Sequence, residues 1–194
     1  MIRGLLSILL IFSCIVLYAQ KKDEEIVWSK DIKLTWDDFK GRPKSSSTAG
    51  AITSSGIGRD FVYNNGLITL NAKAAFNIKE SWVKETSRHI KALEHEQGHF
   101  DITELYARKF RIVVLETKFK KDGEKAKNQL LKIYDIIARE WDAYQDLYDK
   151  ETNHHINQEK QAEWFAKIAK ELVELEAYST PEITIDLNKK SCKK

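Results

Sequence analysis

The chain has 194 residues, of which 42% are hydrophobic and 31% are charged, and its formal net charge is +3 at pH 7. This length is enough for one domain with its own hydrophobic core. The charge is far too small for the basic surface by which proteins bind nucleic acid, so we expect no nucleic-acid partner.

The first 19 residues have the pattern of a secretory signal peptide. Arg3 precedes an apolar run from Leu5 to Tyr18, and Ala19 is followed by a charged segment. A run of about 14 apolar residues is too short to span a bilayer comfortably. We therefore expect cleavage after Ala19 and no stable membrane insertion. The sequence predicts a secreted or periplasmic protein with one mature domain over residues 20–194.

The two cysteines give little support for a disulfide. Cys14 lies in the leader, and Cys192 lies in a lysine-rich tail. Lipidation of Cys14 is a weaker alternative to cleavage, because Phe12 fits poorly before a lipidated cysteine. After cleavage Cys192 is the only cysteine, so the core and any metal must stabilise the exported domain.

The first half of the mature chain predicts short strands. These cover residues 26–28, 32–36, 51–58, 61–64 and 68–78. Asn65-Gly66 is a strong signal for a two-residue hairpin turn. From Ile68 to Ile78 apolar and polar residues alternate, which predicts a strand with one buried face. Such a strand can hold an extended peptide by main-chain hydrogen bonds, or it can simply cover a neighbouring helix.

The second half predicts three long helices and one last strand. The helices cover about residues 82–118, 124–147 and 157–178, and the strand covers residues 182–187. Ser81 is the predicted N-cap of the first helix. Since neither half has much core alone, we expect an α+β fold in which a small antiparallel sheet from the N-terminal half packs on the three helices.

The first of these helices contains the motif H-E-x-x-H, as His95, Glu96 and His99. Histidines four residues apart project from one face of a helix, where they can supply two ligands of a zinc site. Glu96 lies about 100° around the helix axis from His95, where it can reach a water on the metal without binding the metal. The motif therefore predicts a metallohydrolase with Glu96 as general base.

The alternative is that the two histidines lie on a solvated helix surface. The helical projection argues against it, because His95 and His99 share one stripe with Ala92, Ile102 and Tyr106. Two unpaired imidazoles on a buried stripe would be costly to desolvate, whereas metal coordination satisfies both. Gly98 in the middle of this helix predicts that another group packs closely against the helix backbone.

A catalytic zinc site needs a third protein ligand. If the first two helices pair antiparallel about a turn near residue 121, then His99 and His95 are level with residues 143 and 147. Candidates for the third ligand therefore cluster at residues 148–155, which include His154, His155 and two carboxylates.

Several segments resemble a bacterial domain family described as predicted secreted zinc-dependent proteases. They are residues 34–39 with Gly41 and Pro43, Ser81-Trp82, residues 95–102, Tyr148-Asp149, residues 151–154, Gln158, Gln161 and Trp164. The family's Thr-x-His-Gly pattern matches Thr152, Asn153 and His154, which implies His154 as third ligand. This chain has His155 where the pattern has glycine, so His155 stays an alternative. The resemblance implies a zincin-like fold.

Neighbouring residues have possible supporting roles. Asp149 or Glu151 can accept the free ring N–H of a ligating histidine. Tyr148 can donate a hydrogen bond to a developing oxyanion.

The residues and the resemblance together predict a secreted zinc metallopeptidase. In this interpretation His95, His99 and His154 hold Zn²⁺, Glu96 is the general base, and the partner is a peptide or protein substrate. One alternative is an exported helical binding or scaffold domain whose metal is structural or absent. Another is a zinc amidase that acts on cell-wall material.

Overall fold

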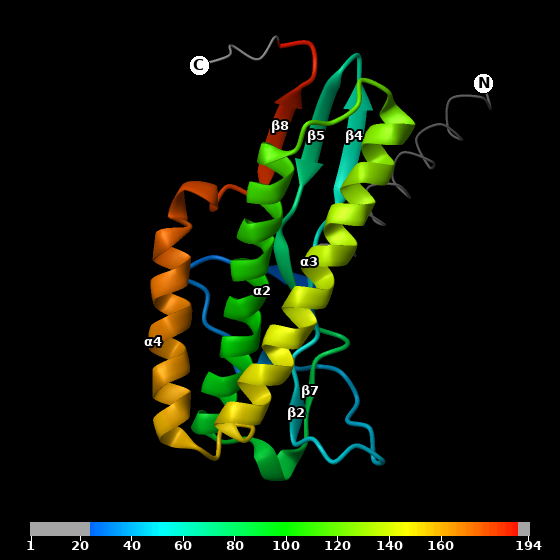
Figure 1. Cartoon of the computed structure of the whole chain (residues 1–194). Coiled ribbons are helices and arrows are strands. Elements are labelled where there is room, and N and C mark those ends of the chain that lie inside the picture. The colour runs from blue at the N-terminus through cyan, green and yellow to red at the C-terminus, as the bar shows by residue number, and fades with distance from the viewer. Residues whose placement is uncertain (1–23, 190–194) are drawn as a thin grey trace, which may run out of the picture.

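The computed structural model describes residues 24–189, which form an α+β fold as the sequence predicts (Figure 1). The predicted leader and the tail with Cys192 lie outside the described residues. Among the described helices, none is long and apolar enough to cross a membrane. The helices are α2 (Ile90–Glu116), α3 (Gly123–Thr152) and α4 (Gln158–Glu174), with single 3-10 turns at Trp36–Asp38, Glu85–Ser87 and Glu176–Tyr178.

The described strands pair antiparallel in three small sheets. The strands are β1 (Glu25–Val27), β2 (Ala51–Ile52), β3 (Ser55–Ile57), β4 (Asp60–Asn64), β5 (Leu67–Asn71), β6 (Ala74–Asn77), β7 (Trp82–Val83) and β8 (Glu182–Asp186). Their orders are β1-β6-β3, β2-β7 and β4-β5-β8. The predicted hairpin is confirmed between β4 and β5. Asn65 and Gly66 have φ angles of 46° and 85°, as a two-residue hairpin turn requires.

Two predicted strands are each divided between sheets. The even-numbered residues from 68 to 76 are at most 1% exposed, which confirms the predicted alternation. However, β5 pairs with β4 and β8, whereas β6 pairs with β1 and β3. The division falls at Ala72, whose N–H donates to the Pro181 carbonyl (2.9 Å) and whose carbonyl accepts from Arg111 (2.7 Å). Residues 51–58 divide likewise into β2, which pairs with β7, and β3, which pairs with β6.

The predicted start of the first long helix is wrong. Trp82 and Val83 pair with β2 and are buried, so they form β7 instead of a first helical turn. The hydroxyl of Ser81, the predicted N-cap, bonds to the main chain of Ser54. The helix begins at Ile90, where the side chain of His89 accepts a hydrogen bond from the helix backbone. Pairing with a distant strand has overridden a local capping signal.

The predicted strand over residues 32–36 is also absent from the structure. The main-chain N–H of Leu34 donates to the side chain of Gln97 (2.8 Å), and that of Thr35 donates to Asp38 (2.7 Å). Side chains, rather than a neighbouring strand, therefore accept the hydrogen bonds of these main-chain N–H groups.

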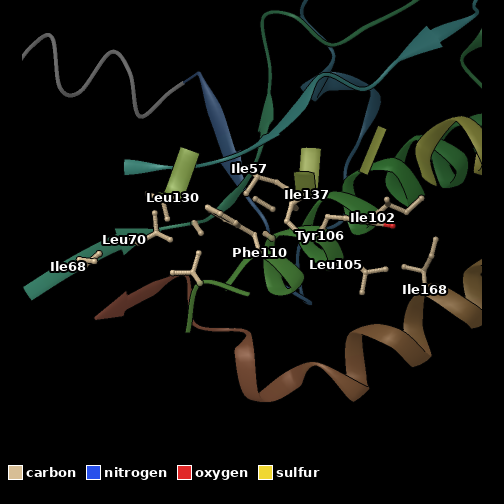
Figure 2. Packing of buried hydrophobic residues seen from close by; sticks show 14 of the residues in the cluster. Ile57, Ile68, Leu70, Ile102, Leu105, Tyr106, Phe110, Leu130, Ile137 and Ile168 are labelled. Carbon is tan, nitrogen blue, oxygen red and sulfur yellow. The ribbon is translucent and has the colours of Figure 1, made fainter. Parts of the chain in front are cut away.

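The core lies around α2, which contacts α3, α4 and the strands (Figures 1 and 2). Figure 2 shows apolar side chains from β3, β5, α3 and α4 packing around α2. The labelled residues are Ile57, Ile68, Leu70, Ile102, Leu105, Tyr106, Phe110, Leu130, Ile137 and Ile168. This central position makes α2 the fixed frame for the residues that it carries.

A buried ion cluster ties α2 to its neighbours. Glu104 Oε1 accepts from Arg108 Nε (2.9 Å) and from Arg111 Nη2 (2.6 Å), and all three side chains are at most 4% exposed. Burial raises the pKa of the Glu104 carboxyl, and the two guanidinium groups offset only part of this effect. The arginines also donate to the carbonyls of Ala72 and Leu172, so the cluster joins α2 to the sheet and to α4.

Removing the carboxylate from this cluster is expected to cost much of the stability. Glu104→Ala leaves two buried guanidinium groups without their shared partner, so the free energy of unfolding should fall by about 3–5 kcal/mol. Urea unfolding at pH 7 measures the change. Glu163→Ala, which breaks the exposed pair with Lys160, is the matched control and should cost less than about 0.5 kcal/mol. Equal effects of the two substitutions would contradict the assignment.

Candidate metal centre

The candidate metal centre lies where the start of α2, the end of α3 and the start of α4 meet at one end of the helical layer (Figure 1). The side chains of His95 and His99 on α2 are only 3% and 14% exposed. The predicted buried stripe is therefore confirmed, and the two histidines do not lie on a solvated surface.

The end of α3 faces these histidines in nearly the predicted register. α3 extends past residue 147, its predicted end, so that Asp149 lies within the helix. Asp149 Oδ1 is 2.9 Å from His95 Nε2 and 2.9 Å from His99 Nε2. The same oxygen is 3.5 Å from His154 Nδ1. One carboxylate oxygen thus stands among three imidazoles.

A hydrogen-bond network fixes which ring nitrogens of His95 and His99 carry hydrogen. Gln145 donates to the His99 carbonyl (3.1 Å), so its oxygen accepts from His99 Nδ1 (2.7 Å). Gln161 donates to the Tyr148 hydroxyl (2.6 Å), so its oxygen accepts from His95 Nδ1 (2.9 Å). Each neutral ring therefore presents a bare Nε2 lone pair.

These two lone pairs point at the anionic oxygen of Asp149, an arrangement that needs positive charge at its centre. Protons can supply it. Burial acts to lower the pKa of His99, but the hydrogen bond that protonated His99 donates to Asp149 and the charges of Glu96 and Asp149 outweigh burial and raise this pKa. Burial likewise acts to raise the pKa of Asp149, but the hydrogen bonds and charges of His95 and His99 hold it well below its usual range. A single divalent cation can replace both protons.

The donor atoms fit such a cation. His95, Asp149 and His154 each offer a ligand atom within 4.8 Å of the other two, so these three residues can hold a metal ion. We call them the ligand group. Zinc bonds of about 2.0–2.1 Å place tetrahedral ligand atoms about 3.3 Å apart, close to the separations of 2.9–3.5 Å around Asp149. Asp149 belongs to the ligand group itself, and Gln145 and Gln161 accept the outer ring N–H groups.

Glu96 lies in a cleft of about 740 Å³ that the ligand group also lines. The residue is 6% exposed, and its Oε2 has no hydrogen-bond partner among residues 24–189. Leaving a buried carboxylate oxygen unpaired is costly, so such groups are typical of sites that act on a ligand. The main chain of Glu96 is fixed by the Thr53 hydroxyl, which donates to its carbonyl (3.2 Å).

The turn after α3 brings His154, rather than His155, to the ligand group. The ring of His155 lies 4.9 Å from the ring of His89, and no contact joins it to Asp149 within the described residues. The φ angle of His155 is 75°, in the left-handed region that favours glycine.

Gly98 lets α3 approach the metal-binding helix. A Cβ atom at Gly98 would lie 2.2 Å from the Tyr148 hydroxyl oxygen, so the predicted close contact is confirmed. The hydroxyl donates to the His95 carbonyl (3.1 Å) and accepts from Gln161. Its hydrogen is thus committed to the helix and is not available for an oxyanion, contrary to the role considered from sequence.

Sequence reasoning missed the two glutamines. Gln145 and Asp149 are four residues apart on one face of α3, and the antiparallel register could have found this pair opposite His99. Gln161 is among the residues that carry the family resemblance, but its role depends on how α4 packs and did not follow from the sequence. Glu151, considered as a second acceptor for a ligating histidine, instead accepts from the Trp164 indole (2.8 Å).

Substitution of Gly98 should damage the site although it favours the helix. Gly98→Ala gains about 1 kcal/mol in helix propensity, but the new methyl group clashes with buried Tyr148 and costs more than this gain. We expect a net loss of stability together with weaker zinc binding, measured by thermal unfolding and by zinc titration. The double variant Gly98→Ala with Tyr148→Ala removes the clash and should regain part of the zinc affinity. No regain would contradict the argument.

A comparison with known protein families assigns the chain to one of them. Residues 30–155 match the family described as "Bacterial protein of unknown function (DUF922)", and this segment contains the H-E-x-x-H motif, Asp149 and His154. No curated protein and no solved structure gives a significant match. The family description names no activity, so the protease function stays a prediction. Because the matched residues are more than half of the chain, the protein belongs to the bacterial family DUF922.

Proposed function

We propose that the protein is an exported zinc-dependent peptidase. The observation that carries the proposal is the buried, unpaired Oε2 of Glu96, which lies in one cleft with the ligand group. A general base must be close to the reacting water and free of other partners. Glu96 Oε2 is free of other partners among the described residues. The place of Glu96 directly after His95 in the H-E-x-x-H motif supports its closeness to the reacting water.

Our proposed ligand set is His95, His99 and Asp149, in which His99 takes the place that His154 holds in the group whose ligand atoms lie within 4.8 Å of one another. Asp149 Oδ1 lies 2.9 Å from both Nε2 atoms, whereas His154 is farther away and its side chain is 72% exposed. In this assignment His154 stands at the open side of the site. The sequence-based set of His95, His99 and His154 remains the competing assignment.

The residues of the chain then have separate tasks in peptide hydrolysis. When bound, zinc lowers the pKa of a coordinated water and polarises the scissile carbonyl. Glu96 accepts a proton from the attacking water as its oxygen adds to the carbonyl carbon. Glu96 delivers this proton to the amine nitrogen as the C–N bond breaks. Gln145 and Gln161 hold the two imidazoles in the ligating tautomer throughout.

The openness of the site favours catalysis over a structural metal. Structural zinc sites are closed by four protein ligands, whereas catalytic sites keep one position open. Here His95, His99 and Asp149 line an open cleft together with the exposed ring of His154. The predicted leader supports an extracellular or periplasmic location for the reaction, with peptide or protein substrates.

Metal analysis distinguishes the two ligand sets. We expect wild-type protein to bind one zinc ion, and Asp149→Ala to retain less than about a tenth of it under the same dialysis conditions. His154→Ala should retain most of the zinc, and His155→Ala serves as its control from the same turn. Plasma emission spectrometry gives the stoichiometry. Loss of zinc from His154→Ala with retention in Asp149→Ala would restore the sequence-based set.

The general-base role is tested by Glu96→Gln. This change keeps the size of the side chain but removes its basicity, so peptide cleavage should fall by at least about 100-fold while zinc content is unchanged. Glu94→Gln, on the same helix but outside the cleft, should keep full activity. An internally quenched peptide measures both rates. A Glu96→Gln variant that is fully active would refute the mechanism.

A further inference from the structure

The cleft at the candidate metal centre is distinctive in its charge. The chain contains 32 lysine and arginine residues, yet none of those within residues 24–189 lines this cleft. Its acidic lining residues are Glu96 and Asp149. With a divalent cation bound, the two carboxylates balance the charge of the metal. The cleft then has no surplus cation with which to pair an anionic group of a ligand.

Large apolar side chains border the same cleft. Ile52 of β2 is 41% exposed, and Ile156, in the turn before α4, is 68% exposed. Trp141 of α3 adds an aromatic ring to the lining. Exposed apolar side chains gathered around one cleft are typical of a binding surface. Residues 48–55 also line the cleft; all of them are uncharged, and all except Ile52 are small.

Resting on the proposed peptidase function, we infer that the cleft accepts an uncharged, apolar stretch from the interior of a polypeptide. Sites that bind a terminal carboxylate use an arginine or a lysine, because burying an unpaired carboxylate is costly. The lining of this cleft offers neither. The same argument disfavours cell-wall stem peptides, which carry several free carboxylates, and so speaks against the cell-wall amidase alternative.

Binding to the zinc-loaded Glu96→Gln variant tests this inference without turnover. The probes are two fluorescein-labelled decapeptides blocked at both ends, one built from Ala, Leu, Val and Ser and one in which Glu replaces each Leu. By fluorescence anisotropy the apolar peptide should bind at least about tenfold more tightly than the acidic one.

A positive charge added to the cleft should weaken this preference. In the same Glu96→Gln background, Ile52→Arg places a cation in the lining and should reduce the difference between the peptides to less than about threefold. Val62→Arg is the matched control, because Val62 is 62% exposed on β4 and does not line the cleft. It should leave the tenfold preference unchanged. Circular dichroism checks that both variants are folded.

The outcomes separate the inference from the function on which it rests. Cleavage of both peptides by the wild type, with equal or tighter binding of the acidic one, overturns the inference and leaves the peptidase proposal intact. Release of stem peptides from purified peptidoglycan overturns it as well. If the zinc-loaded wild type cleaves no peptide and no unfolded protein, the peptidase proposal falls and the inference falls with it.

Discussion

The convergence of two imidazole nitrogens on one carboxylate oxygen is the constraint on which this end of the structure depends. His95 and His99 reach Asp149 from a neighbouring helix at 2.9 Å each, and their outer nitrogens are already taken by glutamines. In neutral form the rings can offer only lone pairs to an anion. The arrangement therefore has to hold positive charge, either as protons or as a metal ion, and the ligand types suit a divalent metal.

The positions of His95, His99 and Asp149 depend on close packing between α2 and α3. Gly98 removes the side chain that would keep the helices apart, and Tyr148 fills the space and bonds to the backbone of α2. Farther along α2, Glu104 and its arginines fix the same helix to the sheet and to α4. One helix thus carries both the main core contacts and the candidate ligands, which leaves little freedom for the ligands to move.

The cleft combines three features that bear on what it can bind. It contains a buried carboxylate oxygen without a partner, a ligand group for a cation, and exposed apolar side chains, and no lysine or arginine among residues 24–189 lines it. A bound divalent cation neutralises the two carboxylates, so the remaining forces that can hold a substrate are apolar contacts and main-chain hydrogen bonds. These forces suit an extended polypeptide better than a small anion.

The sequence by itself determined the α+β class, the hairpin at Asn65-Gly66, and the buried stripe with His95 and His99, because these depend on local turn chemistry and on periodicity within one element. It also indicated which part of α3 faces the motif, since antiparallel helices joined by a short turn have a fixed register. Only the tertiary structure decided that residues 82 and 83 form a strand, since a partner 30 residues away supplies its hydrogen bonds. It also decided that Asp149 lies among the imidazoles and that glutamines hold their outer nitrogens. These contacts join side chains from three separate helices, and their distances follow from packing rather than from sequence spacing.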